Sequence, residues 1–116
     1  MRKLLILCII ILAGCTSSYK TITPEEVYNN IDNDKVIIID VRTYTEYQEG
    51  HIKNAINIPL DELNTIKLDK DTTIYVYCQS GNRSKMAIDL LQDLGFDKIY
   101  DMGGIINWKY ELEKEG

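Results

Sequence analysis

Short apolar runs alternate with stretches of helical periodicity along most of the chain. Residues 36–39 (VIII) form a continuous β-branched run, which is the pattern of a strand buried on both faces. Residues 72–77 (TTIYVY) predict a second strand, and residues 55–58 and 98–100 predict two shorter ones. Polar or helix-like segments separate these runs, so strands and helices are expected to alternate.

Helix start signals open several of the intervening segments. Thr23 is followed by Pro24 and Glu26, which combines a capping residue, a proline at the first helical position and a glutamate that reaches back. Thr43 and Glu46 offer a second capping box. Further helices are expected over residues 60–66, from Ser84 to a stop at Gly95, and, after a turn at Gly103 and Gly104, along the stripe Ile105, Trp108 and Leu112.

This alternation predicts an α/β domain built around a mainly parallel central sheet of about five strands. In such folds the reactive groups lie beyond the carboxyl ends of the strands. Cys78 directly follows the strand predicted at residues 72–77 and is therefore the first candidate for chemistry.

Composition limits the chain to one ordinary globular domain. The sequence has 116 residues, of which 45% are apolar and 27% are charged, and it contains no repeat of solenoid length. Its 13 basic and 18 acidic residues give a net charge of −5. Nucleic acid is not expected as a partner, because there is no basic excess to neutralise phosphates.

The first fifteen residues have the layout of an export signal. Arg2 and Lys3 form a positive head, residues 4–13 (LLILCIIILA) are apolar, and Gly14 and Cys15 follow. As a helix, ten residues rise about 15 Å, half of the roughly 30 Å hydrocarbon core, so this run is too short for a stable span.

The segment Leu12-Ala13-Gly14-Cys15 resembles the lipobox of bacterial lipoproteins. The resemblance implies that residues 1–14 are removed as a signal peptide and that Cys15 receives acyl chains. Residues 15–19 would then form a lipidated tether, and residues 20–116 the domain. We therefore expect a lipid-anchored protein of the cell envelope, on the outer face of the cytoplasmic membrane or in the periplasm. Cys78 would be its only free thiol.

The segment from Cys78 to Ser84 (CQSGNRS) links a buried strand to the start of an amphipathic helix. Helix starts expose unpaired N–H groups, and Gly81 permits a positive φ that lets successive amides curl around one point. Arg83 adds a permanent positive charge at the rim. Such a ring favours the thiolate form of Cys78 and would hold an anion that the sulfur attacks. The plainer alternative is that Cys78 is a small apolar residue at a strand end.

Cys78-x4-Arg83 followed by Ser84 closely resembles the active loop of single-domain rhodaneses, which are sulfurtransferases. Asp40-Val41-Arg42, Glu46 and residues 50–59 (GHIKNAINIP) are similar to an upstream block of that family. Residues 101–104 (DMGG) with Trp108 are similar to its closing block. The three elements occur in order over residues 20–110, and the overall likeness is to small exported thiosulfate sulfurtransferases.

The resemblance implies a rhodanese-like three-layer domain and a two-step reaction through a Cys78 persulfide. Thiosulfate or a similar donor would supply the sulfur, and cyanide or a thiol would accept it, with no metal and no organic cofactor. Donor binding is expected from Gln79, Ser80, Gly81, Asn82 and Arg83, with support from Asp40, Arg42 and Ser84. Asp40 and Arg42 are expected to form a bracing ion pair, His51 a structural contact and Trp108 a core anchor. The protein is expected to be a monomer.

Two other functions remain open from the sequence. The same loop would serve a persulfide carrier or redox-sensing module that holds sulfur for a partner without turnover. A cysteine-based phosphatase or arsenate reductase is disfavoured, because the loop of those enzymes has the pattern Cys-x5-Arg and is one residue longer.

Overall fold

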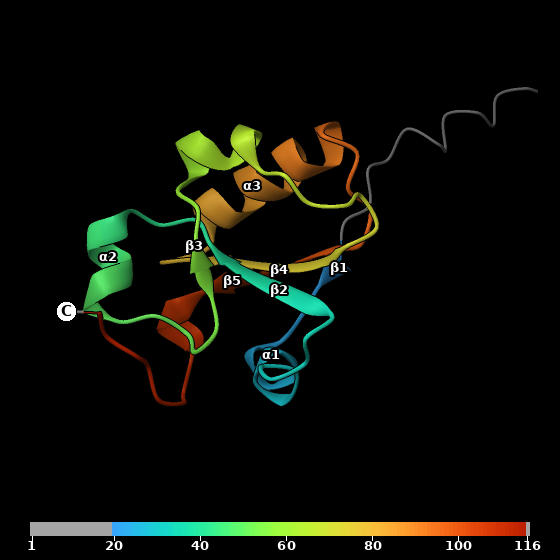
Figure 1. Cartoon of the computed structure of the whole chain (residues 1–116). Helices are drawn as coiled ribbons and strands as arrows, with labels where there is room; N and C mark the ends of the chain where they lie inside the picture. Colours follow the sequence, from blue (N-terminus) through green and yellow to red (C-terminus); the bar gives the residue numbers. More distant parts are fainter. Residues whose placement is uncertain (1–19, 116) are drawn as a thin grey trace, which may run out of the picture.

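The computed structural model describes residues 20–115, which form a parallel five-stranded sheet flanked by helices (Figure 1). The strand order is β1-β5-β4-β2-β3, and every pairing is parallel. The strands are β1 (Lys20–Thr21), β2 (Val36–Asp40), β3 (Ile56–Asn57), β4 (Thr73–Cys78) and β5 (Ile99–Gly104). The predicted fold class and strand number are therefore confirmed.

Helices cover both faces of the sheet and complete three layers. Figure 1 shows α3 (Asn82–Asp93) and the 3₁₀ helix η2 (Leu60–Thr65) on one side and α1 (Pro24–Asn29) on the other. The buried residues divide in the same way. One apolar cluster joins the sheet to α3 and η2 through Leu63, Ala87 and Leu91, and a second joins it to α1 through Val27.

Strand β2 shows why the residues at 36–39 are all apolar. Ile39 belongs to the cluster beneath α3, while its neighbour Ile38 belongs to the cluster beneath α1. Successive side chains of a strand point to opposite faces, so a strand between two helical layers needs apolar residues at every position. Strand β4 follows the same rule, with Val76 on one face and Tyr77 on the other.

Both predicted capping boxes are present. Thr23 caps α1, and its backbone N–H donates to Glu26 Oε1 over 3.0 Å while its hydroxyl accepts from the Glu26 N–H. Thr43 and Glu46 make the same reciprocal pair at the start of α2 (Tyr44–Glu49). Local sequence alone therefore positions the first turns of these two helices.

The prediction of a final helix is wrong. Gly103 and Gly104 belong to β5 rather than to a turn, and only a 3₁₀ turn, η3 (Ile105–Asn107), follows them. The chain then continues without a helix and forms an antiparallel bridge between His51 and Glu113, whose N–H groups donate to each other's carbonyls over 2.9 and 2.8 Å. These long-range hydrogen bonds take the place of helical ones, and the apolar spacing of Ile105 and Leu112 therefore does not reflect a helix.

Strand β1 is the one strand that the sequence analysis did not predict, because it is two exposed residues long and has no apolar pattern. The predicted signal peptide, the lipidated Cys15 and the tether lie outside the described residues. Within residues 20–115, no helix is both long enough and apolar enough to cross a membrane.

Tyr77 connects the centre of the sheet to the segment after α2 through one hydrogen bond. Its buried hydroxyl accepts a hydrogen bond from the Ile52 N–H over 3.0 Å, and burial raises the pKa of Tyr77 so that the hydroxyl stays neutral. In Tyr77→Phe the Ile52 N–H would remain buried without an acceptor, which should lower the free energy of unfolding by about 1–3 kcal/mol.

Urea unfolding of the two variants Tyr77→Phe and Tyr75→Phe measures this effect. Tyr75 lies on the same strand and is also buried, but its hydroxyl has no hydrogen bond within the part of the chain that the structure describes. Tyr75→Phe should therefore leave the midpoint nearly unchanged, and an equal loss in both variants would contradict the assigned role of Tyr77.

Candidate functional site

The thiol of Cys78 accepts hydrogen bonds from the start of helix α3. The Gly81 N–H lies 3.0 Å and the Ser84 N–H 3.3 Å from Cys78 Sγ. Gly81 makes this possible with a φ of +109°, a left-handed conformation that glycine adopts without a steric penalty. Helix α3 has no side-chain cap of the usual kind, so Sγ occupies the position that Thr23 and Thr43 fill in α1 and α2.

The predicted convergence of amides on Cys78 is therefore present, with two of them in contact with the sulfur. Ser84 was predicted only to support the site, yet its buried N–H touches Sγ directly, and its hydroxyl donates to the Gly81 carbonyl over 3.1 Å. Two N–H donors directed at one atom are placed to stabilise negative charge that develops there during a reaction. Gln79, Ser80, Asn82 and Arg83 occupy the same loop, but their N–H groups make no hydrogen bond to Sγ within the described residues.

Cys78 is also part of the apolar core. Its side chain is 1% exposed and belongs to the cluster that includes Ala87 of α3 and Val41. One side of the Cys78 side chain therefore packs in the apolar core, as the alternative interpretation expects. The other side accepts hydrogen bonds from the loop amides.

Gly104 brings strand β5 against the back of the loop. It pairs with Cys78 in the sheet, and a Cβ at this position would lie 2.6 Å from the Gln79 carbonyl oxygen and 2.9 Å from Ser80 Cα. The Ile106 N–H donates to the same Gln79 carbonyl over 3.3 Å. The closing block therefore fixes the loop through backbone contact, a role that the sequence analysis missed when it assigned these glycines to a turn.

Asp40 and Arg42 form the buried ion pair that the sequence analysis expected. Arg42 Nη2 lies 2.7 Å from Asp40 Oδ2 and also donates to the Gly50 carbonyl over 2.7 Å. Burial lowers the pKa of Arg42, but the hydrogen bond and charge of Asp40 outweigh it, so the net shift is upward. Arg42 Nη1 donates to Gln79 Oε1 over 3.2 Å, which links this pair to the loop.

Arg83 forms an ion pair with Glu46 at the rim of the loop. Its Nη1 and Nη2 lie 2.8 and 3.0 Å from the two carboxylate oxygens of Glu46, a bidentate pair in which both side chains are about one-third exposed. The hydrogen bond from Arg83 lowers the pKa of Glu46 to about 2, although burial acts in the opposite direction. The same contact raises the pKa of Arg83. The sequence pattern did not predict this pairing of Arg83 with Glu46.

His51 makes a structural contact, as expected, whereas Trp108, which was expected to be a core anchor, lies only partly buried at the edge of the core. The buried His51 ring stacks on Tyr47 at 3.7 Å between centroids, with Nδ1 2.9 Å from the Tyr47 carbonyl and Nε2 3.6 Å from a Glu115 carboxylate oxygen. Trp108 is half-buried against the cluster beneath α1 and meets the edge of Tyr28. Neither residue has a hydrogen bond to the loop of residues 78–84 among the described residues.

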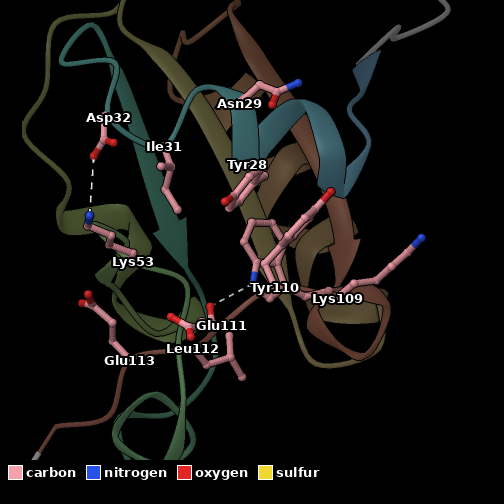
Figure 2. Close-up of a pocket in the computed structure, with 11 residues that line it drawn as sticks. Tyr28, Asn29, Ile31, Asp32, Lys53, Lys109, Tyr110, Glu111, Leu112 and Glu113 are labelled. Atoms are coloured by element: carbon pink, nitrogen blue, oxygen red, sulfur yellow. Dashed lines mark hydrogen bonds and ion pairs between the residues drawn. The ribbon is translucent and has the colours of Figure 1, made fainter.

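Two hollows in the surface differ in their relation to the loop. The larger, about 700 Å³, lies between the end of α1 and the C-terminal segment, where Tyr28 stacks on Tyr110 and Lys53 faces Asp32 (Figure 2). None of the predicted site residues lines it. The smaller, about 280 Å³, adjoins the loop and is lined by Arg42, Glu46, Glu49, Gly50, Gln79, Ile105, Ile106 and Leu112. Across residues 20–115 no group of histidine, cysteine and acidic side chains could hold a metal ion.

The chain belongs to the rhodanese-like domain family, whose model matches residues 23–111. The thiosulfate sulfurtransferase PspE of Escherichia coli is 39% identical over 71 residues, which are 58% of this chain and 68% of that protein. The adenylyltransferase and sulfurtransferase uba4 of Ogataea parapolymorpha is 36% identical over 80 residues, or 66% of this chain and only 21% of that protein.

Solved structures show the same fold. The crystal structure of a rhodanese-like domain protein from Staphylococcus aureus has a TM-score of 0.70 and 36% identity, and the match covers 84% of this chain and 99% of that one. Family and fold are therefore established, and the Cys78 loop lies inside the matched region.

The Glu46–Arg83 pair should make the stability of the fold depend on pH in the acidic range. The folded-state pKa of Glu46 is about 2, below its ordinary value of 4.5, so the pair stabilises the fold above about pH 4.5. That contribution is lost as the pH falls toward 2. Glu46→Gln keeps a residue that can complete the capping box but removes the charge, and should cost about 1 kcal/mol at pH 7.

Urea unfolding of wild type and Glu46→Gln at several pH values between 7 and 2 tests this linkage. The stability difference between them should shrink below about pH 4.5 and vanish near pH 2. A difference that stays constant over the whole range would show that the carboxylate charge does not contribute.

Proposed function

We propose that this protein is a sulfurtransferase that moves sulfane sulfur through a persulfide on Cys78, with thiosulfate or a similar compound as the donor. The observation that supports it most is the pair of amides, Gly81 and Ser84, directed at Cys78 Sγ at the end of a central strand. Membership of the rhodanese-like family and the name of PspE agree with this chemistry.

The proposed reaction has two displacements and no net change in the enzyme. The Cys78 thiolate attacks the outer sulfur of thiosulfate, the S–S bond breaks, and sulfite leaves with the electron pair. Cyanide or a thiolate then attacks the outer sulfur of the Cys78 persulfide, which produces thiocyanate or a new persulfide and releases the Cys78 thiolate. Such covalent catalysis gives ping-pong kinetics and needs no cofactor.

The loop would stabilise charge at each stage of this reaction. The amides of Gly81 and Ser84 hold the attacking and departing Cys78 thiolate. The remaining N–H groups from Gln79 to Arg83 would surround the outer sulfur once the persulfide forms. Arg83 would orient the sulfonate of a donor that displaces Glu46 from its guanidinium. Asp40 and Arg42 would hold the loop through the hydrogen bond to Gln79.

A persulfide carrier without turnover is the second candidate, and the burial of Cys78 favours it. A sulfur that is 1% exposed is well protected from solvent thiols, which suits storage. The phosphatase alternative gains no support, because the loop keeps the shorter Cys-x4-Arg spacing and its arginine is bonded to Glu46.

Thiocyanate formation from thiosulfate and cyanide distinguishes these functions. The full-length protein should turn over, and Cys78→Ser should lose activity by at least about a thousandfold because the nucleophile is gone. After thiosulfate alone, peptide mass spectrometry should find one added sulfur atom on the Cys78 peptide, with the matching peptide of Cys78→Ser as the control.

The outcomes separate cleanly. Persulfide on Cys78 without thiocyanate would identify a carrier, whereas neither persulfide nor turnover would refute sulfur chemistry at this site. Phosphatase activity on para-nitrophenyl phosphate that disappears in Cys78→Ser would support the remaining alternative.

We also propose that the domain is exported and held at a membrane by acyl chains on Cys15, on the strength of the lipobox-like segment 12–15. The wild-type chain should fractionate with membranes and gain lipid mass, while Cys15→Ser should lose both the lipid and the membrane association. An unlipidated wild-type product with the same distribution as Cys15→Ser would refute the anchor.

A further inference from the structure

Both guanidinium groups at the site are already occupied by groups of this chain. Arg42 is buried and bonded to Asp40, the Gly50 carbonyl and Gln79. Arg83 has both terminal nitrogens on the carboxylate of Glu46. An incoming anion therefore finds neither of these two cations unpaired.

Glu46 is held in place independently of Arg83. Its Oε1 also accepts hydrogen bonds from the Thr43 N–H over 2.9 Å and from the Thr43 hydroxyl over 3.1 Å. These bonds form the capping box of α2, so the carboxylate cannot turn away from Arg83 without breaking the hydrogen bonds that cap this helix.

We propose that Glu46 is a specificity-determining residue. It occupies the two terminal nitrogens of the Arg83 guanidinium and thereby selects sulfur donors without a sulfonate, and the class that fits is small organic hydropersulfides whose organic part carries no charge. This inference rests on the proposed sulfur transfer through Cys78. With such a donor the Cys78 thiolate attacks the outer sulfur of RS–SH, the S–S bond breaks, and RS⁻ leaves with the electron pair while the proton remains on the new Cys78 persulfide.

The preference against sulfonate donors follows from the geometry of the Arg83 guanidinium. A sulfonate presents a pair of oxygens to a guanidinium much as a carboxylate does, so thiosulfate and Glu46 compete for the same two N–H directions. Thiosulfate must either displace an anchored carboxylate or stand beside it as a like charge. The net charge of −5 adds to the repulsion.

A hydropersulfide has no sulfonate to compete for Arg83, and its protonated RS–SH form, which is the form attacked by Cys78, also avoids the charge repulsion. The hollow beside the loop also offers apolar surface at Ile106 and Leu112, which are 63% and 43% exposed, so the organic part of a hydropersulfide finds contact there. The wild-type site is thus expected to load sulfur from such donors more readily than from thiosulfate.

The first test compares the rate at which Cys78 gains a sulfur atom from thiosulfate and from 2-hydroxyethyl hydropersulfide, followed by intact-mass spectrometry of quenched samples. Glu46→Gln should raise the rate with thiosulfate by about tenfold, since a charge-assisted pair is opened to the sulfonate. Its rate with the hydropersulfide should stay within about twofold of wild type.

Glu49→Gln is the matched control, because it removes the same charge from the same hollow and the same helix without touching Arg83. It should change the thiosulfate rate by less than about twofold. An unchanged thiosulfate rate in Glu46→Gln, or an equal gain in Glu49→Gln, would overturn the proposal.

The second test measures thiosulfate binding without chemistry, by titration calorimetry on the full chain with Cys78→Ser. Adding Glu46→Gln should tighten binding by about tenfold, and adding Arg83→Gln to that variant should abolish the gain. Equal affinities in all three proteins would refute the role of Glu46. If Cys78 takes sulfur from no donor at all, the proposed function fails, and this binding test still decides the specificity of the Arg83 guanidinium.

Discussion

The chemistry of this domain depends on one short connection, the residues between the end of β4 and the start of α3. Strand β4 is fixed by its pairing with β2 and β5, and α3 is fixed by the burial of Ala87, Ile88 and Leu91. Between these ends the chain must reverse within Gln79, Ser80 and Gly81. The left-handed Gly81 makes the reversal, and the unpaired N–H groups of the new helix then point at Cys78 Sγ. A sulfur atom thus serves as the cap of α3.

The loop is braced from two sides by contacts that leave little freedom. Gly104 packs its backbone against Gln79 and Ser80, where no side chain would fit, and Arg42 reaches Gln79 from the buried pair with Asp40. Preorganised donors are effective in catalysis because they need no rearrangement when charge develops. The bracing therefore links the buried polar groups of the core to the position of the N–H donors around Cys78 Sγ.

The charges around the site are balanced within the protein. Each guanidinium has its own carboxylate, Asp40 for Arg42 and Glu46 for Arg83, so the site combines a strong local hydrogen-bond field with little net positive charge. Because both cations are paired, the site is suited to holding one sulfur atom through N–H donors rather than to binding anions in general. It also gives Glu46 a double role, because the same oxygen caps α2 and engages Arg83.

The sequence by itself determined the β-branched strands, both capping boxes, the alternation that makes the sheet parallel, and the place of Cys78 at a strand end. These features follow from interactions between near neighbours in the chain, which local patterns record. The tertiary structure alone decided the Glu46–Arg83 pair, the approach of Gly104 to the loop and the bridge from His51 to Glu113 that replaced the expected last helix. Glu46 and Arg83 are 37 residues apart, and only the tertiary placement of the first turns of α2 and α3 beyond the adjacent strands β2 and β4 brings their charges within bonding distance.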